Sequence, residues 1–169
     1  GRNALSHFDG TSWRIVFRPA SGEQCAAIAG TGSSDVYIAC YGSFNTIYRF
    51  DGVTWSRMEI GVLTTTLAAA ASNMFAVGDD VYRFAQAAWS RPDPFVNNGP
   101  FHGFAIDQHG GELAADRTTL LRYDQAMWTP VPGAPNGTNY QSLWRESNRI
   151  VIAEQGGGGT PQWLSSHPN

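Results

Sequence analysis

Short apolar segments alternate with polar turns along the whole chain. Residues 36–39 (Val-Tyr-Ile-Ala), 74–77 (Met-Phe-Ala-Val) and 150–153 (Ile-Val-Ile-Ala) are the clearest segments, and residues 112–115 (Glu-Leu-Ala-Ala) form a weaker one. A turn rich in Ser, Asn, Asp or Gly precedes each of them. Short apolar runs bounded by such turns are typical of β-strands, and no segment has a helical period. The pattern therefore predicts an all-β chain.

One short phrase recurs four times. It reads Phe-Asp-Gly-Thr-Ser-Trp at residues 8–13 and Phe-Asp-Gly-Val-Thr-Trp at residues 50–55. Degraded copies stand at residues 84–89 (Phe-Ala-Gln-Ala-Ala-Trp) and 123–128 (Tyr-Asp-Gln-Ala-Met-Trp). The closing residues Trp13, Trp55, Trp89 and Trp128 are separated by 42, 34 and 39 residues. A period of roughly 40 residues is typical of four-stranded propeller blades.

We therefore expect one β-propeller domain of about four four-stranded blades. The repeats would span about residues 17–58, 59–92, 93–132 and 133–169, the last together with residues 1–16. Residues 3–16 supply only the last two strands of a blade, and residues 140–163 supply the first two and a third at most. The two ends can share one blade and close a four-bladed ring. Alternatively, the chain is part of a larger ring, or two chains complete one ring.

The Asp-Gly dipeptide predicts a tight hairpin turn, because type I′ turns need positive φ at both central residues. With Asp51 and Gly52 at the centre, Tyr48 lies opposite Trp55. The same register pairs Tyr82 with Trp89, Leu121 with Trp128 and Ser6 with Trp13. Each Trp is interpreted as a structural residue that packs between blades.

The two cysteines of the chain lie on neighbouring predicted strands. With the turn centred between Gly32 and Ser33, Cys25 lies directly opposite Cys40. Directly opposite residues have Cβ atoms about 4.5–5.5 Å apart, close to bridging distance. This register favours a disulfide and hence an oxidising compartment, with two buried free thiols as the alternative.

The repeats resemble the Trp-containing propeller repeats of large secreted and surface proteins of bacteria. The residues that carry the resemblance are 33–37 (Ser-Ser-Asp-Val-Tyr), 47–55 (Ile-Tyr-Arg-Phe-Asp-Gly-Val-Thr-Trp) and 76–79 (Ala-Val-Gly-Asp). The Asp-Gly-x-x-Trp turn is also similar to a shortened Asp-box of sialidase-like propellers. The third and fourth copies depart from the pattern, because they lack the Gly. The resemblance implies a fold and an extracytoplasmic location, but it implies no single function.

Composition narrows the function classes. The formal net charge is −3 and all basic residues are isolated arginines, which argues against binding to nucleic acid or to an anionic membrane surface. The longest run of small apolar residues, 67–71, is much shorter than the roughly 20 residues of a membrane span. We expect no cofactor and no metal, because the histidines have no ligand-like spacing; these are His102, His109 and His167. The four glycines at 156–159 predict a flexible hairpin loop, and the Asn-Gly-Thr at 136–138 predicts a turn.

Charged residues offer little for catalysis. A sialidase-like enzyme needs arginines that converge on one point, but Arg49, Arg83 and Arg122 occupy the same position in successive repeats, as His7 does in the first. Equivalent blade positions lie around a ring, so we interpret these residues as structural or solvent-facing. The same structural interpretation is given to the acidic residues that end or flank strands, which are Asp79, Asp80, Glu112 and Asp116.

The sequence therefore favours an extracytoplasmic binding or scaffolding propeller, with a protein or carbohydrate ligand. Candidate surface aromatics are Tyr41, Phe44, Trp144 and Trp163, for which core packing is the simpler interpretation. One alternative is a glycoside-processing enzyme related to sialidases. Another is a purely structural repeat segment of a longer surface protein.

Overall fold

The computed structural model describes residues 4–43, 45–70, 73–85, 87–91, 100–106, 111–124, 127–134, 140–146, 149–154 and 162–165. All secondary structure in these residues is β, in five antiparallel sheets. The N-terminal hairpin consists of β1 (Leu5–Phe8) and β2 (Trp13–Phe17). The other strands follow in chain order: β3 (Gln24–Gly32), β4 (Asp35–Tyr41), β5 (Thr46–Phe50), β6 (Trp55–Glu59), β7 (Thr64–Ala70), β8 (Asn73–Gly78), β9 (Val81–Ala85), β10 (Ala88–Ser90), β11 (Gly103–Ile106), β12 (Glu112–Ala115), β13 (Leu120–Asp124), β14 (Met127–Pro130), β15 (Tyr140–Glu146), β16 (Arg149–Glu154) and β17 (Gln162–Ser165).

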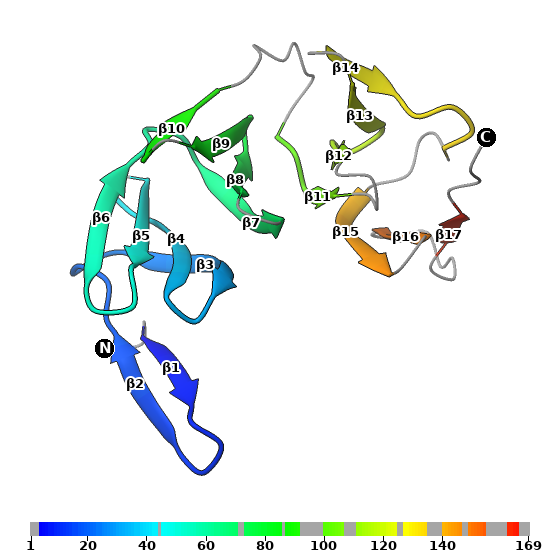
Figure 1. Ribbon diagram of the computed structural model, residues 1–169. Coiled ribbons are helices and arrows are strands. Elements are labelled where there is room, and N and C mark those ends of the chain that lie inside the picture. Colours follow the sequence, from blue (N-terminus) through cyan, green and yellow to red (C-terminus); the bar gives the residue numbers. More distant parts are fainter. Residues whose placement is uncertain are drawn as a thin grey trace.

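The sheets are arranged as propeller blades. Strands β3–β6, β7–β10 and β11–β14 form three four-stranded sheets in which each strand pairs with the next, and β15–β17 form a three-stranded sheet. The first strand of each sheet contacts the first strand of the next, from β3 to β7, β11 and β15. These first strands lie on the inner side of an arc, and the later strands lie toward its outer side (Figure 1). The all-β propeller architecture predicted from the sequence is confirmed.

Apolar side chains fill the spaces between consecutive sheets. Tyr37 and Ile47 of the first sheet pack with Leu67 and Met74 of the second. Similar clusters join the second sheet to the third, around Phe75, and the third to the fourth. Burial of apolar area of this kind is the main force that holds sheets together. Because strands alternate their side chains between two faces, a middle sheet contributes to a cluster on each side.

The hairpin register differs from the predicted one. In the structure Phe50 lies opposite Trp55 and Tyr48 lies opposite Arg57. The turn is centred on Gly52 and Val53, one residue later than predicted. The reason is the Asp51 side chain, whose Oδ1 accepts hydrogen bonds from the backbone N–H groups of Val53 (2.9 Å) and Thr54 (2.7 Å). Gly52 adopts a φ of 96°, in the region that favours glycine.

The other copies have the same corrected register. Phe8 pairs with Trp13, Phe84 with Trp89 and Tyr123 with Trp128, so the predicted partners Ser6, Tyr82 and Leu121 were wrong. In each copy the aromatic ring before the turn lies 5.2–5.3 Å from its Trp, measured between ring centroids.

The cysteine pairing agrees with the sequence prediction. Cys25 lies opposite Cys40, and the two form a disulfide. The strand turn is centred one residue later than predicted, because Gly32 pairs with Asp35. Two irregularities in β3, between Gly30 and Gly32 and between Cys25 and Ala27, then restore the predicted opposition at the cysteines.

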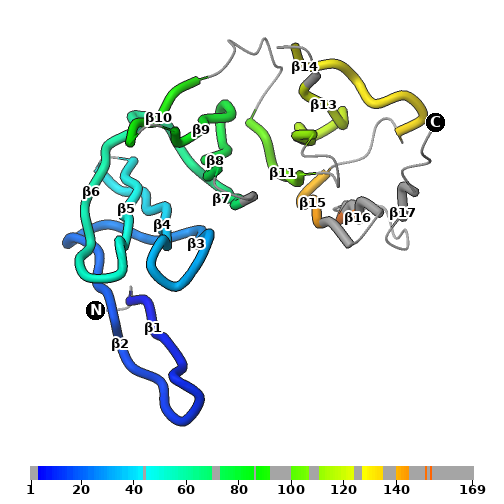
Figure 2. Tube along the Cα trace, in the orientation of Figure 1, coloured from blue at the N-terminus to red at the C-terminus, as the bar shows by residue number. Residues whose placement is uncertain are grey.

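The ends of the chain do not share a blade in this structure. Strands β1–β2 and β15–β17 form separate sheets at opposite ends of the arc, which stays open (Figures 1 and 2). Closure of a four-bladed ring by the two ends is therefore not observed. The neighbouring blades follow a curve that keeps the two ends apart.

Gly52 provides a test of the turn. A Cβ at Gly52 would lie 2.8 Å from Cβ of Ser34, and its φ is unfavourable for other residues. We expect Gly52→Ala to lower the free energy of unfolding by about 1–3 kcal/mol in urea denaturation, since a left-handed conformation costs roughly 1–2 kcal/mol before any clash. Gly32→Ala is the matched control, because a Cβ there meets nothing within 4 Å. Equal stability of the two variants would contradict this account of the turn.

Candidate functional site

The N-terminal hairpin packs on the face of the first sheet that points away from the second sheet. Leu5 and Phe17 of the hairpin contact the cluster formed by Ile38, Cys40 and Tyr48, together with Trp55. The ring of Phe17 lies 4.7 Å from that of Tyr48 and 4.5 Å from that of Trp55, measured between centroids. The hairpin therefore covers residues of the second, third and fourth strands of this sheet.

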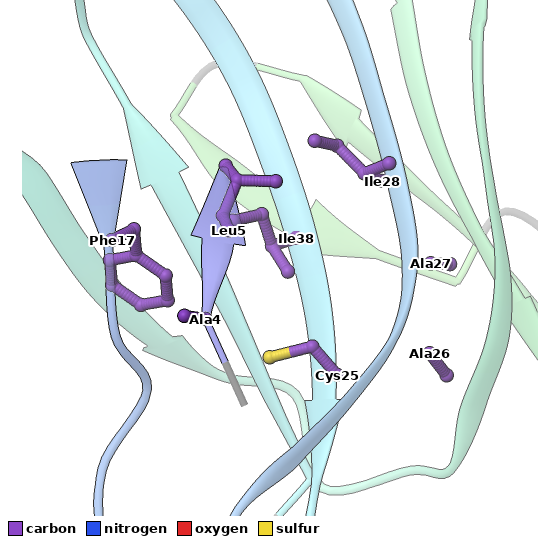
Figure 3. Close-up of a pocket in the computed structure, with 8 residues that line it drawn as sticks. All are labelled: Ala4, Leu5, Phe17, Cys25, Ala26, Ala27, Ile28 and Ile38. Carbon is purple, nitrogen blue, oxygen red and sulfur yellow. The ribbon is translucent and has the colours of Figure 1, made fainter. Parts of the chain in front are cut away.

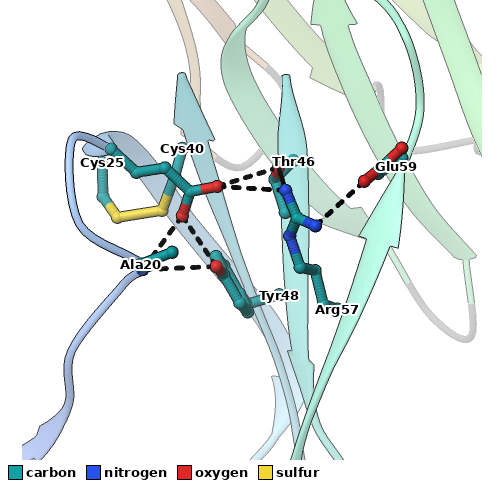
Figure 4. Close-up of polar contacts among 8 residues, drawn as sticks. Ala20, Cys25, Cys40, Thr46, Tyr48, Arg57 and Glu59 are labelled. Atoms are coloured by element: carbon teal, nitrogen blue, oxygen red, sulfur yellow. Dashed lines mark hydrogen bonds and ion pairs between the residues drawn. A yellow bond between two sulfur atoms is a disulfide. The ribbon is translucent and has the colours of Figure 1, made fainter. Parts of the chain in front are cut away.

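A buried carboxylate fixes the connection between the hairpin and the first sheet. Glu23, whose side chain is 6% exposed, accepts hydrogen bonds from the Tyr48 hydroxyl (2.7 Å) and from the Thr46 hydroxyl (3.2 Å). It also accepts one from the backbone N–H of Ala20 (3.2 Å) and forms an ion pair with Arg57 at 3.4 Å. The Cys25–Cys40 disulfide lies beside this network (Figure 4).

Burial alone would raise the pKa of the Glu23 carboxyl. The hydrogen bonds from Tyr48, Thr46 and Ala20, and the charge of Arg57, outweigh burial and hold the pKa below its usual value. The network therefore stabilises the ionised carboxylate in the folded protein.

An apolar groove lies between the hairpin and the inner strands of the first sheet. One part, of about 210 Å³, is lined by Ala4, Leu5, Phe17, Cys25, Ala26, Ala27, Ile28 and Ile38. Leu5 and Ile38 lie side by side there, between Phe17 and Ile28 (Figure 3). A second part, of about 570 Å³, is lined by Leu5, Ser6, His7, Val16, Ile28, Ser33, Val36, Phe50, Val53 and Trp55. Ile28 belongs to both parts and remains 53% exposed.

The groove has an unpaired strand edge along one side. Within the described residues β1 pairs with β2 alone, whereas the equivalent third strands β5, β9 and β13 each lie between two partners. The backbone N–H and C=O groups on a free strand edge can pair with another strand. His7 is the one titratable side chain among these lining residues, and most of the others are apolar, so the groove can bind an apolar, extended segment.

The structure places the predicted tryptophans at the outer part of each sheet. Trp55, Trp89 and Trp128 are half-buried. Trp55 contacts Phe17 of the hairpin, Trp89 contacts Tyr37 of the first sheet, and Trp128 contacts Phe101, which precedes β11. Trp13, at 70% exposed, has no such neighbour outside its hairpin among the described residues. It belongs to the hairpin at the open end of the arc.

The arginines of the repeat are used in different ways. Arg49 donates to Asp35 at 2.9 Å and lies over the rings of Tyr37 and Phe84. Arg83 of the second sheet forms an ion pair with Glu112 of the third. Burial raises the pKa of the Glu112 carboxyl above its usual range, against the opposing charge of Arg83. Arg122 lies in β13 opposite Leu113 and Thr129. These arginines do not meet at one point.

The acidic candidates have local partners. Glu112 begins β12 and Asp116 follows its end, so a whole strand separates them. Asp116 caps its own turn by accepting hydrogen bonds from the N–H groups of Thr118 and Thr119, both at 2.7 Å. Asp80 forms an ion pair with Arg91. Within the part of the chain that the structure describes, no group of three metal-ligating side chains is present.

The remaining candidates are dispersed. Tyr41 and Trp144 are exposed, and the Tyr41 hydroxyl donates to Gln24 at 3.1 Å. His102 is half-buried beside Arg117. Phe44, His109, His167, the sequon at 136–138, the glycines at 156–159 and the side chain of Trp163 lie outside the described residues. The sequence pattern did not reveal the groove. Its one signal was Ile28, a large residue in a strand of otherwise small side chains.

The Glu23 network predicts acid sensitivity. Because the folded pKa is lowered, the network contributes stability above the unfolded pKa of about 4.3, and that stability is lost as the pH falls through the folded pKa. Glu23→Gln should lower the free energy of unfolding at pH 7. It should also reduce the stability lost between pH 5 and pH 3, each measured by urea denaturation. Glu59→Gln is the control, because it removes the exposed ion pair of Glu59 with Arg57 and leaves the hydrogen bonds of Glu23 in place. An equal acid response of wild type and Glu23→Gln would contradict the assignment.

The comparisons with known proteins support the β-propeller fold and identify no family or activity. No protein-family model and no curated protein matches the sequence. Among solved structures, YCF48 bound to D1 peptide matches 91% of this chain with a TM-score of 0.64 at 12% identity. Virginiamycin B lyase from Staphylococcus aureus matches 99% with a TM-score of 0.66 at 8% identity. The extracellular domain of the hybrid two-component system BT4673 from B. thetaiotaomicron matches 89% with a TM-score of 0.64 at 13% identity.

These likenesses define the class of the protein, a β-propeller architecture. The chain spans 55%, 64% and 23% of the three matched chains, respectively, less than two thirds of each. At such identities the similarity covers the path of the backbone and does not transfer activity.

Proposed function

We propose that this protein is an extracytoplasmic binding and scaffolding propeller that takes up a protein strand in the groove beside β1. The observation that carries the proposal is the juxtaposition of a free strand edge with an apolar groove. Strand addition of this kind gains affinity from backbone hydrogen bonds and specificity from side-chain pockets. Here the free edge of β1 supplies the backbone groups, and the apolar groove supplies the side-chain pocket.

The location is inferred from the disulfide. Disulfides persist in oxidising compartments and are rare in the cytosol. Cys25 and Cys40 are bonded to each other, and no described cysteine is free. That BT4673 contributes an extracellular domain of similar fold is in keeping with this location. No helix in the described residues could cross a membrane.

A protein ligand is favoured over a carbohydrate by the chemistry of the groove. Its larger part offers the side chains of Ser6, His7 and Ser33 as polar groups, and its other lining side chains are apolar. Sugar recognition needs many converging hydrogen-bonding groups, which these residues do not provide. The peptide in the YCF48 structure shows that a protein of this architecture can bind a polypeptide. A glycoside-processing activity draws no support from the dispersed arginines and carboxylates.

The proposal is tested by selecting random displayed peptides on the purified chain. We expect enrichment of extended sequences with alternating apolar residues, bound with an affinity that Ile28→Lys lowers by about tenfold or more, equal to about 1.4 kcal/mol. Ile28 is the exposed residue shared by both parts of the groove.

Met127→Lys is the matched control, because Met127 is 61% exposed in β14 and remote from the groove. A glycan array on the same protein provides the opposing arm. Glycan binding that is insensitive to Ile28→Lys, without peptide enrichment, would overturn the proposal.

A further inference from the structure

Within the described residues, the first and last sheets carry complementary sets of blade strands. The hairpin β1–β2 corresponds to the third and fourth strands of a blade, since Phe8 pairs with Trp13 as Phe50 pairs with Trp55. Strands β15 and β16 correspond to the first two strands of a blade, since β15 contacts β11 as β7 contacts β3. Within the described residues the hairpin has no strand in the two inner blade positions, and the β15–β17 sheet has three strands. Together β15, β16, β1 and β2 would form one complete blade.

Apolar side chains are also exposed at each end of the arc, on the face of the end sheet that points away from its neighbouring sheet. At the N-terminal end, Ile28 of β3 is 53% exposed. In the second and fourth sheets, the first strand points Leu67 and Leu143, respectively, toward the preceding sheet, and both residues are buried. At the C-terminal end, Trp144 is 60% exposed on the face of β15 opposite to Leu143. Trp144 lies opposite Val151 of β16, so the two residues share this free face.

One chain does not bring these ends together. The hairpin and the β15–β17 sheet lie at opposite ends of the open arc (Figure 1). The β15–β17 sheet of one copy therefore does not reach the groove of the same copy. A second copy of this chain carries the strand pair β15–β16, with an apolar outer face that matches the groove.

We propose that two copies of this chain complete each other. Strands β15–β16 of one copy lie against β1 and the open face of the β3–β6 sheet of the other, and Trp144 enters the groove beside Ile28. This inference rests on the proposed function, because it names the protein strands that the groove receives. The contact joins different surfaces of the two copies, and when each copy uses both of its ends, the pair closes into one ring.

We call the proposed pairing of β16 of one copy with β1 of the other the joint. Its register follows from the register of the blades within one chain. In the first sheet Tyr37 of the second strand lies opposite Arg49 of the third. His7 holds the position of Arg49 in the hairpin, and Val151 holds that of Tyr37 in β16, because Ile152 lies opposite Leu143 as Ile38 lies opposite Ile28. His7 of one copy should therefore lie directly opposite Val151 of the other.

Strand β17 competes with this joint. It pairs with the edge of β16 that β1 needs, through the residues from Arg149 to Ile152. Strand β1 also offers four residues, and it brings β2 with it as a fourth strand. Replacing β17 by β1 thus keeps the pairing of β16 and converts a three-stranded sheet into a four-stranded one. The joint should become tighter when β17 is removed.

The first experiment is light scattering on the full chain over a range of concentrations. We expect a particle of twice the 18.3 kDa chain mass. Ile28→Lys and Trp144→Lys should each give a single-chain particle, whereas the exposed control Met127→Lys should keep the double mass. A variant that ends at Glu154 should pair more tightly, with a dissociation constant lower by about tenfold or more, because β17 no longer competes.

The second experiment tests the register by mixing two variants that each carry one added cysteine. The natural cysteines do not interfere, because they are bonded to each other. His7→Cys and Val151→Cys should form an intermolecular disulfide, since opposite Cβ atoms lie about 4.5–5.5 Å apart. His7→Cys with Ala153→Cys, two residues away, should cross-link much less.

The outcomes separate this inference from the proposed function. A single-chain particle at every concentration, with peptide binding that still depends on Ile28, would overturn the pairing of copies and leave the proposed function standing. Loss of both would overturn both. A double-mass particle that is unaffected by Ile28→Lys and Trp144→Lys, or a particle larger than two chains, would also overturn the closed pair.

Discussion

The packing of one sheet against the next is the interaction on which the rest of this structure depends. Each four-stranded sheet has apolar residues on both faces, because its strands alternate their side chains and are covered from two sides. Tyr37 and Phe75 are almost fully buried between consecutive sheets. A sheet of this kind cannot be stable alone, so every blade needs a neighbour on each side. The middle sheets have both neighbours within the chain.

The same requirement explains where the candidate site lies. At the N-terminal end the hairpin covers residues of β4, β5 and β6 and leaves Ile28 of the first strand, β3, exposed. The groove beside Ile28 is therefore the unfilled part of an interface that is complete elsewhere in the chain. The Glu23 network fixes β5 to the segment that leads out of the hairpin, and the Cys25–Cys40 disulfide joins β3 to β4. A fixed edge loses little conformational entropy when a strand binds.

The polar residues of the repeat serve the architecture. Asp51 and Asp116 cap turns with their side-chain oxygens, and Arg83 links the second sheet to the third through Glu112. Residues at equivalent positions in successive blades are displaced along the arc, so they do not converge on a substrate.

The sequence alone determined the all-β class, the order of short strands, the three four-stranded sheets and the opposition of Cys25 and Cys40. These features follow from local hydrophobic patterns and from a repeated phrase, both of which are visible without coordinates. The hairpin register was not determined, because an Asp-Gly pair can begin a turn or form its centre. A turn centre displaced by one residue moves each partner by two, which leaves every side chain on the same face and the pattern unchanged. The tertiary structure decided the open arc and the exposure of Ile28 and Trp144, because the number of blades depends on the angles between packed sheets, and no local pattern encodes those angles.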